Sequence, residues 1–175
     1  ALTQATYEQG GAGTQTAALA FGGQRQPGII ENNTQKYDGS SWTNTGNLNE
    51  SRRFIMGFGI QTAAVAAGGS SSPAPNTTAT EEFDGTTWSV QATLGTARYN
   101  HYGAGTDNTT ALYAAGGPPS GLAIAEEYTR STNVITPGAW ASGGNMTEGR
   151  GTGGDCGTQT AGLVFGGNPI SAPYT

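Results

Sequence analysis

Short runs of small and apolar residues, each ending in a pair of glycines, recur along the chain. They occupy residues 15–23, 61–69, 109–117 and 159–167, and within the repeating unit a variable loop of Pro, Ser, Asn and Gly follows such a run. Apolar residues never recur at spacings of three and four over a dozen positions, as an amphipathic helix requires. The pattern therefore predicts short strands and turns, with helix essentially absent.

Three further markers keep the register of the glycine pairs. Each tryptophan is followed ten residues later by an arginine, and a glycine comes seven residues beyond each arginine. The three sets are Trp42, Arg52 and Gly59; Trp88, Arg98 and Gly105; and Trp140, Arg150 and Gly157. Markers that keep one register predict a tandem structural repeat.

A strand, a tight turn and the tryptophan complete each unit. Residues 37–42 read Tyr-Asp-Gly-Ser-Ser-Trp, and residues 83–88 read Phe-Asp-Gly-Thr-Thr-Trp. Asp-Gly between strand-like flanks predicts a two-residue hairpin, because glycine accepts a positive φ. In the third unit Tyr128 and Trp140 stand twelve positions apart and Asp-Gly is missing, so residues 129–139 are expected to form a longer hairpin loop.

Each unit thus reads as four short antiparallel strands, and a period near fifty residues is typical of a β-propeller blade. We expect a single all-β domain over residues 1–175 with about three and a half repeats. The expected divisions are an incomplete blade at residues 1–33, blades at 34–79 and 80–122, and an incomplete blade at 123–175.

The chain starts and stops within a unit, because it has four glycine-pair strands and three tryptophan strands. An incomplete blade leaves an unpaired strand edge, which proteins normally cover. Three arrangements remain open: edges paired with another subunit, a small closed ring near four blades, or a segment of a longer chain. We expect partner subunits or a longer parent chain rather than a self-sufficient monomer.

The glycine pair after an apolar strand, the aromatic residue beyond it, the tryptophan after a turn and the arginine before the next unit resemble the kelch repeat. That repeat also forms the propeller domain of galactose oxidase, and the resemblance covers nearly the whole chain. The segments Thr-Gln-Thr-Ala-Ala (residues 14–18) and Asp-Gly-Thr-Thr-Trp (residues 84–88) are similar, more specifically, to kelch-like repeats in virion proteins of marine and cyanobacterial phages. The chain has fewer units than the family's usual blade count.

Composition and charge exclude several classes of function. Twelve carboxylates against seven Lys and Arg side chains give a net charge of -5, whereas nucleic-acid binding needs clustered positive charge. Cys156 is the only cysteine and His101 the only histidine, which excludes intrachain disulfides, Cys-rich zinc sites and the two-histidine copper site that galactose oxidase implies. No apolar run approaches the roughly 20 residues that span a bilayer. We expect no cofactor, no metal, no nucleic acid and no membrane insertion.

Aromatic residues recur at two positions of the unit and allow two interpretations. They can stack on sugar rings, or they can fill the space between neighbouring blades. Because their place in the unit is fixed, we expect them to form the structural core. The residues are Tyr37, Trp42, Phe83, Trp88, Tyr128 and Trp140.

The recurrent arginines are the candidate ligand-binding residues. Consecutive strands are antiparallel, so the arginines are expected at the same face as the loops at residues 24–33, 70–78 and 118–122. There they can ring an anion or carboxylate site, or they can bond carbonyls and carboxylates of an adjacent blade, including Glu81-Glu82 and Glu126-Glu127. The candidate ligand-binding set is Arg52, Arg98, Arg150, Tyr99 and His101.

No pair of acids suits catalysis. Glu81 and Glu82 are neighbours on a strand, so their side chains are expected on opposite faces. Asp38, Asp84 and Asp107 stand at turns, where an aspartate bonds its own backbone. A glycan-processing hydrolase would need convergent acids in one pocket. We therefore predict no catalytic residue and a protein that is not an enzyme.

These features and the resemblance together predict a non-enzymatic structural or adhesion module of a virion, such as a tail fibre, spike or capsid decoration. The expected location is the virion surface or another extracellular setting. Expected partners are other virion subunits or copies of itself, with variable loops presented to a cell-surface glycan or protein of the host. The alternative is a cellular or secreted kelch-type protein-interaction module.

Overall fold

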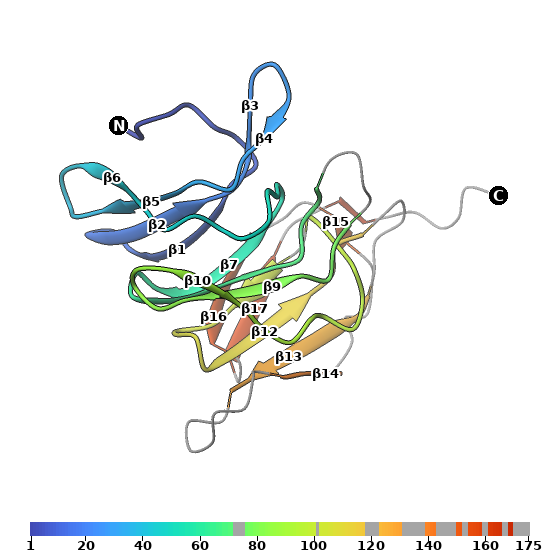
Figure 1. Cartoon of the computed structure of the whole chain (residues 1–175). Helices are drawn as coiled ribbons and strands as arrows, with labels where there is room; N and C mark the ends of the chain where they lie inside the picture. Colours follow the sequence, from blue (N-terminus) through green and yellow to red (C-terminus); the bar gives the residue numbers. More distant parts are fainter. Residues whose placement is uncertain are drawn as a thin grey trace.

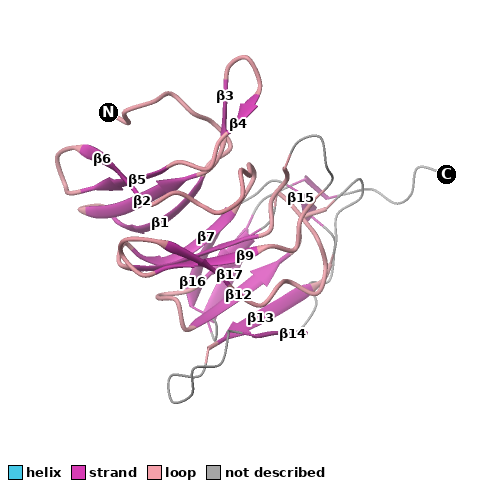
Figure 2. Cartoon of the chain, viewed as in Figure 1, coloured by secondary structure: helices cyan, strands magenta, loops and turns pink. Residues whose placement is uncertain are grey.

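The structure, a computed structural model, describes residues 1–71, 76–100, 102–117 and 123–130, together with the backbone of five strands between residues 139 and 169. In these residues the regular elements are strands, and no helix occurs among them (Figure 2). The strands form several antiparallel sheets. The all-β prediction is therefore confirmed.

Three four-stranded sheets make up most of the chain (Figure 1). Sheet 1 has the order β1 (Gly10–Thr14), β2 (Ala17–Phe21), β5 (Thr34–Tyr37) and β6 (Trp42–Thr45). Sheet 2 contains β7 (Met56–Ile60), β8 (Ala63–Ala67), β9 (Thr80–Phe83) and β10 (Trp88–Val90). Sheet 3 contains β11 (Tyr102–Ala104), β12 (Thr110–Ala114), β13 (Ala125–Thr129) and β14 (Ala139–Ser142).

Three two-stranded pairs complete the described part. They are β3 (Gln24–Arg25) with β4 (Ile29–Ile30), β15 (Arg150–Gly151) with β18 (Asn168–Pro169), and β16 (Gly154–Thr158) with β17 (Ala161–Phe165). The pair of β16 with β17 repeats the register of β1 with β2, since Gly154 lies opposite Phe165 as Gly10 lies opposite Phe21. It therefore corresponds to the first half of a fourth sheet.

The units differ in their bounds from the expected divisions. Each sheet pairs its second strand with its third across the loop, as β2 with β5, β8 with β9 and β12 with β13. These pairings cross the expected divisions at residues 33/34, 79/80 and 122/123. A sheet therefore begins at the glycine-rich strand beyond each link, where a link is the segment that precedes a sheet (residues 1–9, 46–55 and 91–100).

The sheets lie against one another in chain order. β1 lies beside β7 (Figure 1), β7 lies beside β11, and β11 lies beside β16. One core, with Leu19, Phe21 and Trp88, separates sheets 1 and 2, and a second, with Phe58 and Tyr128, separates sheets 2 and 3. Because sheet 2 is covered on both faces, β8 is apolar along its whole length rather than alternating with polar residues.

Glycines let the first strands of successive sheets approach closely. A Cβ atom on Gly57 in β7 would lie 2.2 Å from the carbonyl oxygen of Gly11 in β1 and 2.5 Å from Cζ of Phe21. A Cβ atom on Gly103 in β11 would overlap the side chain of Met56. The close contact between consecutive sheets therefore requires glycine in these strands.

The Asp-Gly turns are four residues long, not the two-residue turns expected from the sequence. Phe83 pairs directly with Trp88, and the Asp84 carboxylate accepts hydrogen bonds of 2.8 Å from the backbone N–H groups of Thr86 and Thr87. These bonds lower the pKa of Asp84 below its ordinary value. The aspartate side chain thus organises the turn, as the sequence did predict.

The third unit contains the expected longer hairpin. Tyr128 lies opposite Trp140 and Thr129 opposite Ala139. The loop between these strands lies outside the described residues.

Replacing Gly57 with alanine is expected to destabilise the chain by about 1–3 kcal/mol, because the new methyl group meets backbone that cannot move aside. Urea denaturation measures the change. Gly11→Ala is the matched control, since its Cβ would have only one neighbour, at 3.4 Å. Equal losses from the two variants would contradict the close approach of β1 and β7.

Candidate functional site

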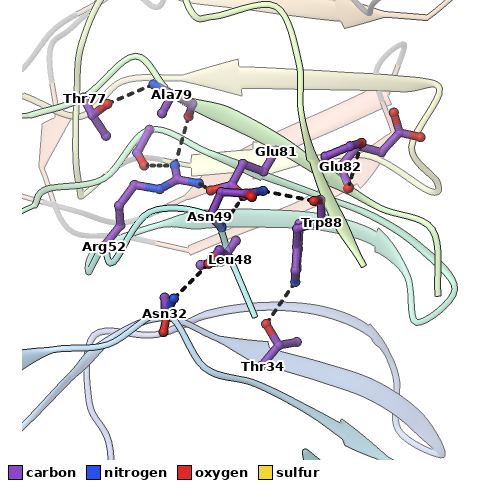
Figure 3. Close-up of polar contacts among 12 residues, drawn as sticks. Asn32, Thr34, Leu48, Asn49, Arg52, Thr77, Ala79, Glu81, Glu82 and Trp88 are labelled. Atoms are coloured by element: carbon purple, nitrogen blue, oxygen red, sulfur yellow. Dashed lines mark hydrogen bonds and ion pairs between the residues drawn. The ribbon is translucent and has the colours of Figure 1, made fainter. Parts of the chain in front are cut away.

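Arg52 joins sheet 1 to sheet 2. Its guanidinium group donates to the carbonyl oxygens of Gly68 (2.8 Å) and Ala79 (3.0 Å) and to Oε1 of Glu81 (2.7 Å), all in sheet 2 or in the loop between β8 and β9 (Figure 3). Its own carbonyl oxygen accepts a hydrogen bond of 2.8 Å from the backbone N–H of Gly23, directly after β2. One residue is therefore bonded to both sheets.

Arg98 repeats this arrangement between sheets 2 and 3. Its guanidinium group donates to the carbonyl oxygens of Ala115 (3.3 Å) and Ile124 (3.1 Å) and forms an ion pair with Glu126. Its carbonyl oxygen accepts a hydrogen bond of 2.9 Å from the N–H of Gly69. The spacing of the arginines in the sequence thus corresponds to a repeated three-dimensional contact.

The second carboxylate oxygen of each of these glutamates accepts hydrogen bonds from the link that precedes the sheet. Oε2 of Glu81 accepts hydrogen bonds of 2.7 Å from both the backbone N–H and the side-chain amide of Asn49 (Figure 3). Oε2 of Glu126 accepts a hydrogen bond of 2.7 Å from the N–H of Gly95. Both charges of each ion pair are therefore hydrogen-bonded, which a buried ion pair requires.

Sheet 1 has the same contact without the charges. Thr6 occupies the position of the arginine and Gln35 that of the glutamate, and the N–H of Thr3 donates to Oε1 of Gln35 at 3.0 Å. Gln35 is 1% exposed, and neither its Nε2 atom nor Oγ1 of Thr6 has a hydrogen-bond partner. Because sheet 1 lacks both the arginine and the glutamate, it contains no buried carboxylate without a counter-charge at this contact.

These contacts give Arg52 and Arg98 a structural role. Both residues are 0% exposed, so neither guanidinium group can reach a ligand. They bond carbonyls and a carboxylate, which is the second of the two interpretations drawn from the sequence. The backbone of Arg150 lies in β15, but its side chain and the whole of His101 lie outside the described residues.

Glu82 lies on the opposite face of sheet 2 from Glu81, as the strand period predicts. It bonds the side chains of Asn108 and Arg130 of the third unit. Burial raises the pKa of Glu82 above its ordinary value, although Arg130 acts in the other direction. The two neighbouring glutamates therefore attach sheet 2 to different parts of the chain and do not form a pair.

The recurrent aromatic residues differ between the sheets in their burial. Trp88 packs edge-on against Phe21, with ring centroids 4.9 Å apart, and its Nε1–H donates to Oγ1 of Thr34 at 2.9 Å (Figure 3). Phe83 and Tyr128 are fully buried, and burial raises the pKa of Tyr128 to about 12. The remaining residues are Tyr37 and Trp42, which are partly buried and pack on each other, and Trp140, whose side chain lies outside the described residues.

The links and the loops emerge at one end of the sheets, as the antiparallel order predicted. Each link pairs through its backbone with the start of a loop: Tyr7 with Gln24, Arg53 with Ser70, and Tyr99 with Gly117. We call this surface the loop end, made of residues 7–8, 53–54 and 99–100 and the described residues of the loops that follow β2, β8 and β12. The Asp-Gly turns lie at the other end of the sheets.

Aromatic and polar side chains meet at the loop end. Arg53 donates to Glu8 at 3.2 Å and to Gln24, and its guanidinium carbon lies 4.9 Å from the centroid of the Phe54 ring. The rings of Phe54 and Tyr99 lie 5.5 Å apart. All five side chains are partly buried, so they form a mixed surface held by mutual contacts.

A strained backbone position recurs at the loop end. Glu8, Phe54 and Asn100 stand 46 residues apart, and all have a positive φ, of 61°, 54° and 49°. Left-handed backbone is unfavourable for residues with a side chain. Sequence reasoning missed these positions because none of them is glycine, although each comes two residues after the position of the arginine.

An open hollow of about 450 Å³ lies beside the first link. Its lining residues are Gln4, Ala5, Thr6, Tyr7, Arg25 and Gln26. The β3–β4 hairpin, which projects from sheet 1 (Figure 1), supplies Arg25 and Gln26 of this lining. Tyr7 is 40% exposed, so an aromatic ring is accessible at this part of the loop end.

Neither a model of a known protein family nor a curated protein sequence matches this chain. Within the described ranges, no three His, Cys, Asp or Glu side chains gather closely enough to hold a metal ion. In the same part of the chain, no helix has the length and apolarity needed to cross a bilayer.

Replacing Arg52 with threonine is expected to destabilise the chain by about 3–5 kcal/mol, because Glu81 is left buried with no counter-charge. The double variant Arg52→Thr with Glu81→Gln reproduces the uncharged pair of sheet 1 and is expected to recover a large part of this loss. Urea denaturation of the two variants measures the difference. Equal stability of the single and double variants would contradict the account of the ion pair.

Proposed function

We propose that this chain is a segment of a kelch-like β-propeller that acts as a non-enzymatic structural and adhesion module on the surface of a virion. Its loop end binds a glycan or a protein of the host surface. The observation that carries this proposal is the contrast between the two ends of the sheets. In sheets 1 and 2, one end carries short turns closed by Asp38 and Asp84, and the other end carries the loops with Tyr7, Arg53, Phe54 and Tyr99.

The propeller is supported by how the sheets are arranged. Each is an antiparallel meander of four strands, and the first strands of successive sheets lie side by side. A propeller places the first strand of each blade nearest its axis, so the loop end would form one face around that axis. Loops on a rigid β scaffold are the usual position of binding residues.

Adhesion is supported by the composition of the loop end. Aromatic rings can contact the apolar faces of sugar rings, while Arg53 and Gln24 can exchange hydrogen bonds with hydroxyl groups. Tyr, Ser, Gly and Asn also dominate other binding loops, because they give contact area and adaptable hydrogen bonding at low entropic cost. The loops here are rich in Ser, Asn, Pro and Gly.

A structural rather than catalytic role is supported by how the acids are used. Glu81 and Glu126 each form an ion pair with an arginine and accept a hydrogen bond from a link, and Glu82 forms an ion pair with Arg130. Asp84 closes a turn. Each of these carboxylates therefore has a contact within the fold that accounts for it.

Binding of the chain to a glycan array and to host cells tests the role of the loop end. Phe54→Asn removes the ring but keeps a residue that tolerates a positive φ, and asparagine already stands at the equivalent position 100. Loss of one aromatic contact of about 1–1.5 kcal/mol is expected to weaken binding about tenfold. Tyr99→Ala is expected to act similarly.

Thr86→Ala is the control, because Thr86 is exposed and lies at the opposite end of the sheets. A loss of binding with Thr86→Ala as large as with Phe54→Asn would contradict binding at the loop end. Mass spectrometry of purified virions tests the setting and is expected to detect peptides of this chain. Their absence would instead favour the cellular or secreted interaction module.

A further inference from the structure

One face of sheet 1 differs in burial from the equivalent faces of sheets 2 and 3. In sheet 2 the face that bears the tryptophan packs on sheet 1, so Ala64, Ala66 and Phe83 are 0% exposed and Trp88 is 6% exposed. The strand registers give the equivalent residues of sheet 1 as Ala18, Ala20, Tyr37 and Trp42. All four are only partly buried. We call this surface the open face of sheet 1.

The contact between sheets 1 and 2 shows what covers such a face. Trp88 packs on Phe21 of β2 and donates to Thr34 of β5, and Leu19 of β2 belongs to the same core. A sheet face that bears the tryptophan is therefore covered by a sheet face with Leu and Phe two positions apart on its second strand. The covering face belongs to the neighbouring sheet and is the face opposite to that sheet's own tryptophan.

The pair of β16 and β17 carries that complement in its register. Leu163 and Phe165 lie opposite Cys156 and Gly154, as Leu19 and Phe21 lie opposite Ala12 and Gly10. β16 lies beside β11, so sheet 3 precedes this pair as sheet 1 precedes sheet 2. Among the described residues, no further sheet follows the pair.

The open face carries no charge that would repel a second copy. Beyond the four residues above, the register places on it Asn44 and also Gln35, which is buried beneath the first link. All six residues are uncharged, although the chain has a net charge of -5. Two acidic chains can therefore approach at this face without bringing carboxylates together.

We propose that the open face of sheet 1 binds a second copy of this chain, whose β16–β17 pair packs on it through the positions of Leu163 and Phe165. The contact reproduces the one between sheets 1 and 2. It uses different surfaces of the two copies, so it extends head to tail into a ring or a linear assembly. It depends neither on the virion setting nor on binding at the loop end.

Sedimentation velocity over a range of concentrations tests this interface with two variants, each blocked on one side. Trp42→Lys places a charge on the open face, and Phe165→Lys places one on the β16–β17 pair. The wild-type chain is expected to form dimers and larger species, whereas each variant alone stays monomeric, with association weakened at least tenfold. An equimolar mixture of the two variants is expected to form dimers and nothing larger, because it retains one competent pair of faces.

Val90→Lys is the control, because Val90 is 70% exposed on β10 and is not part of the proposed contact. It is expected to associate as the wild-type chain does. Circular dichroism verifies that each variant is folded, and Ala18→Glu replaces Trp42→Lys if that variant unfolds.

Two results would overturn the interface. A wild-type chain that is monomeric at every concentration would assign the open face to a different partner, such as a further sheet of a longer chain. A mixture that associates no more than its two components would show that the two faces do not bind each other.

Discussion

A buried arginine at each of the two junctions among sheets 1, 2 and 3 is the contact on which the rest of the structure depends. Its backbone carbonyl is bonded to the sheet before it, and its guanidinium group to the sheet after it. Because the partner glutamate also binds the backbone of the link, one ion pair fixes both the spacing of the sheets and the path of the chain between them. Small sheets with separate cores are thereby joined into one array, in which each unit contacts its neighbours.

The same contact positions the candidate binding surface. Arg53 and Phe54 directly follow Arg52, and Tyr99 directly follows Arg98, so these side chains stand at the loop end because the arginines are held below them. Sheet 1 retains the hydrogen bond from its link to Gln35 but lacks the charges. Variation in the exposed residues after the arginine is therefore compatible with a constant structural contact beneath them.

The repeat, the absence of helix in the described part and the location of the links beside the loops could be predicted, because each depends on residue spacing and strand direction. The burial of Arg52 and Arg98 could not be decided, because it depends on glutamates about thirty residues further along. The positive φ of Phe54 could not be predicted, because no glycine marks that position in the sequence. The four-residue length of the Asp-Gly turn could not be predicted either, because it depends on hydrogen bonds to the Asp84 side chain. The bounds of the sheets were misplaced because strand pairing spans the variable loops.

Hydrogen exchange in the Arg52→Thr variant tests most directly whether the arginine joins the sheets. The amide proton of Gly23, which follows β2, is bonded to the carbonyl oxygen of Arg52, and that of Asn49, in the link, is bonded to Glu81. Both are expected to exchange at least tenfold faster in the variant, while the equivalent amides of Gly69 and Gly95, which depend on Arg98 and Glu126, change much less. Equal acceleration at all four amides, or none at Gly23, would contradict a coupling carried by this side chain.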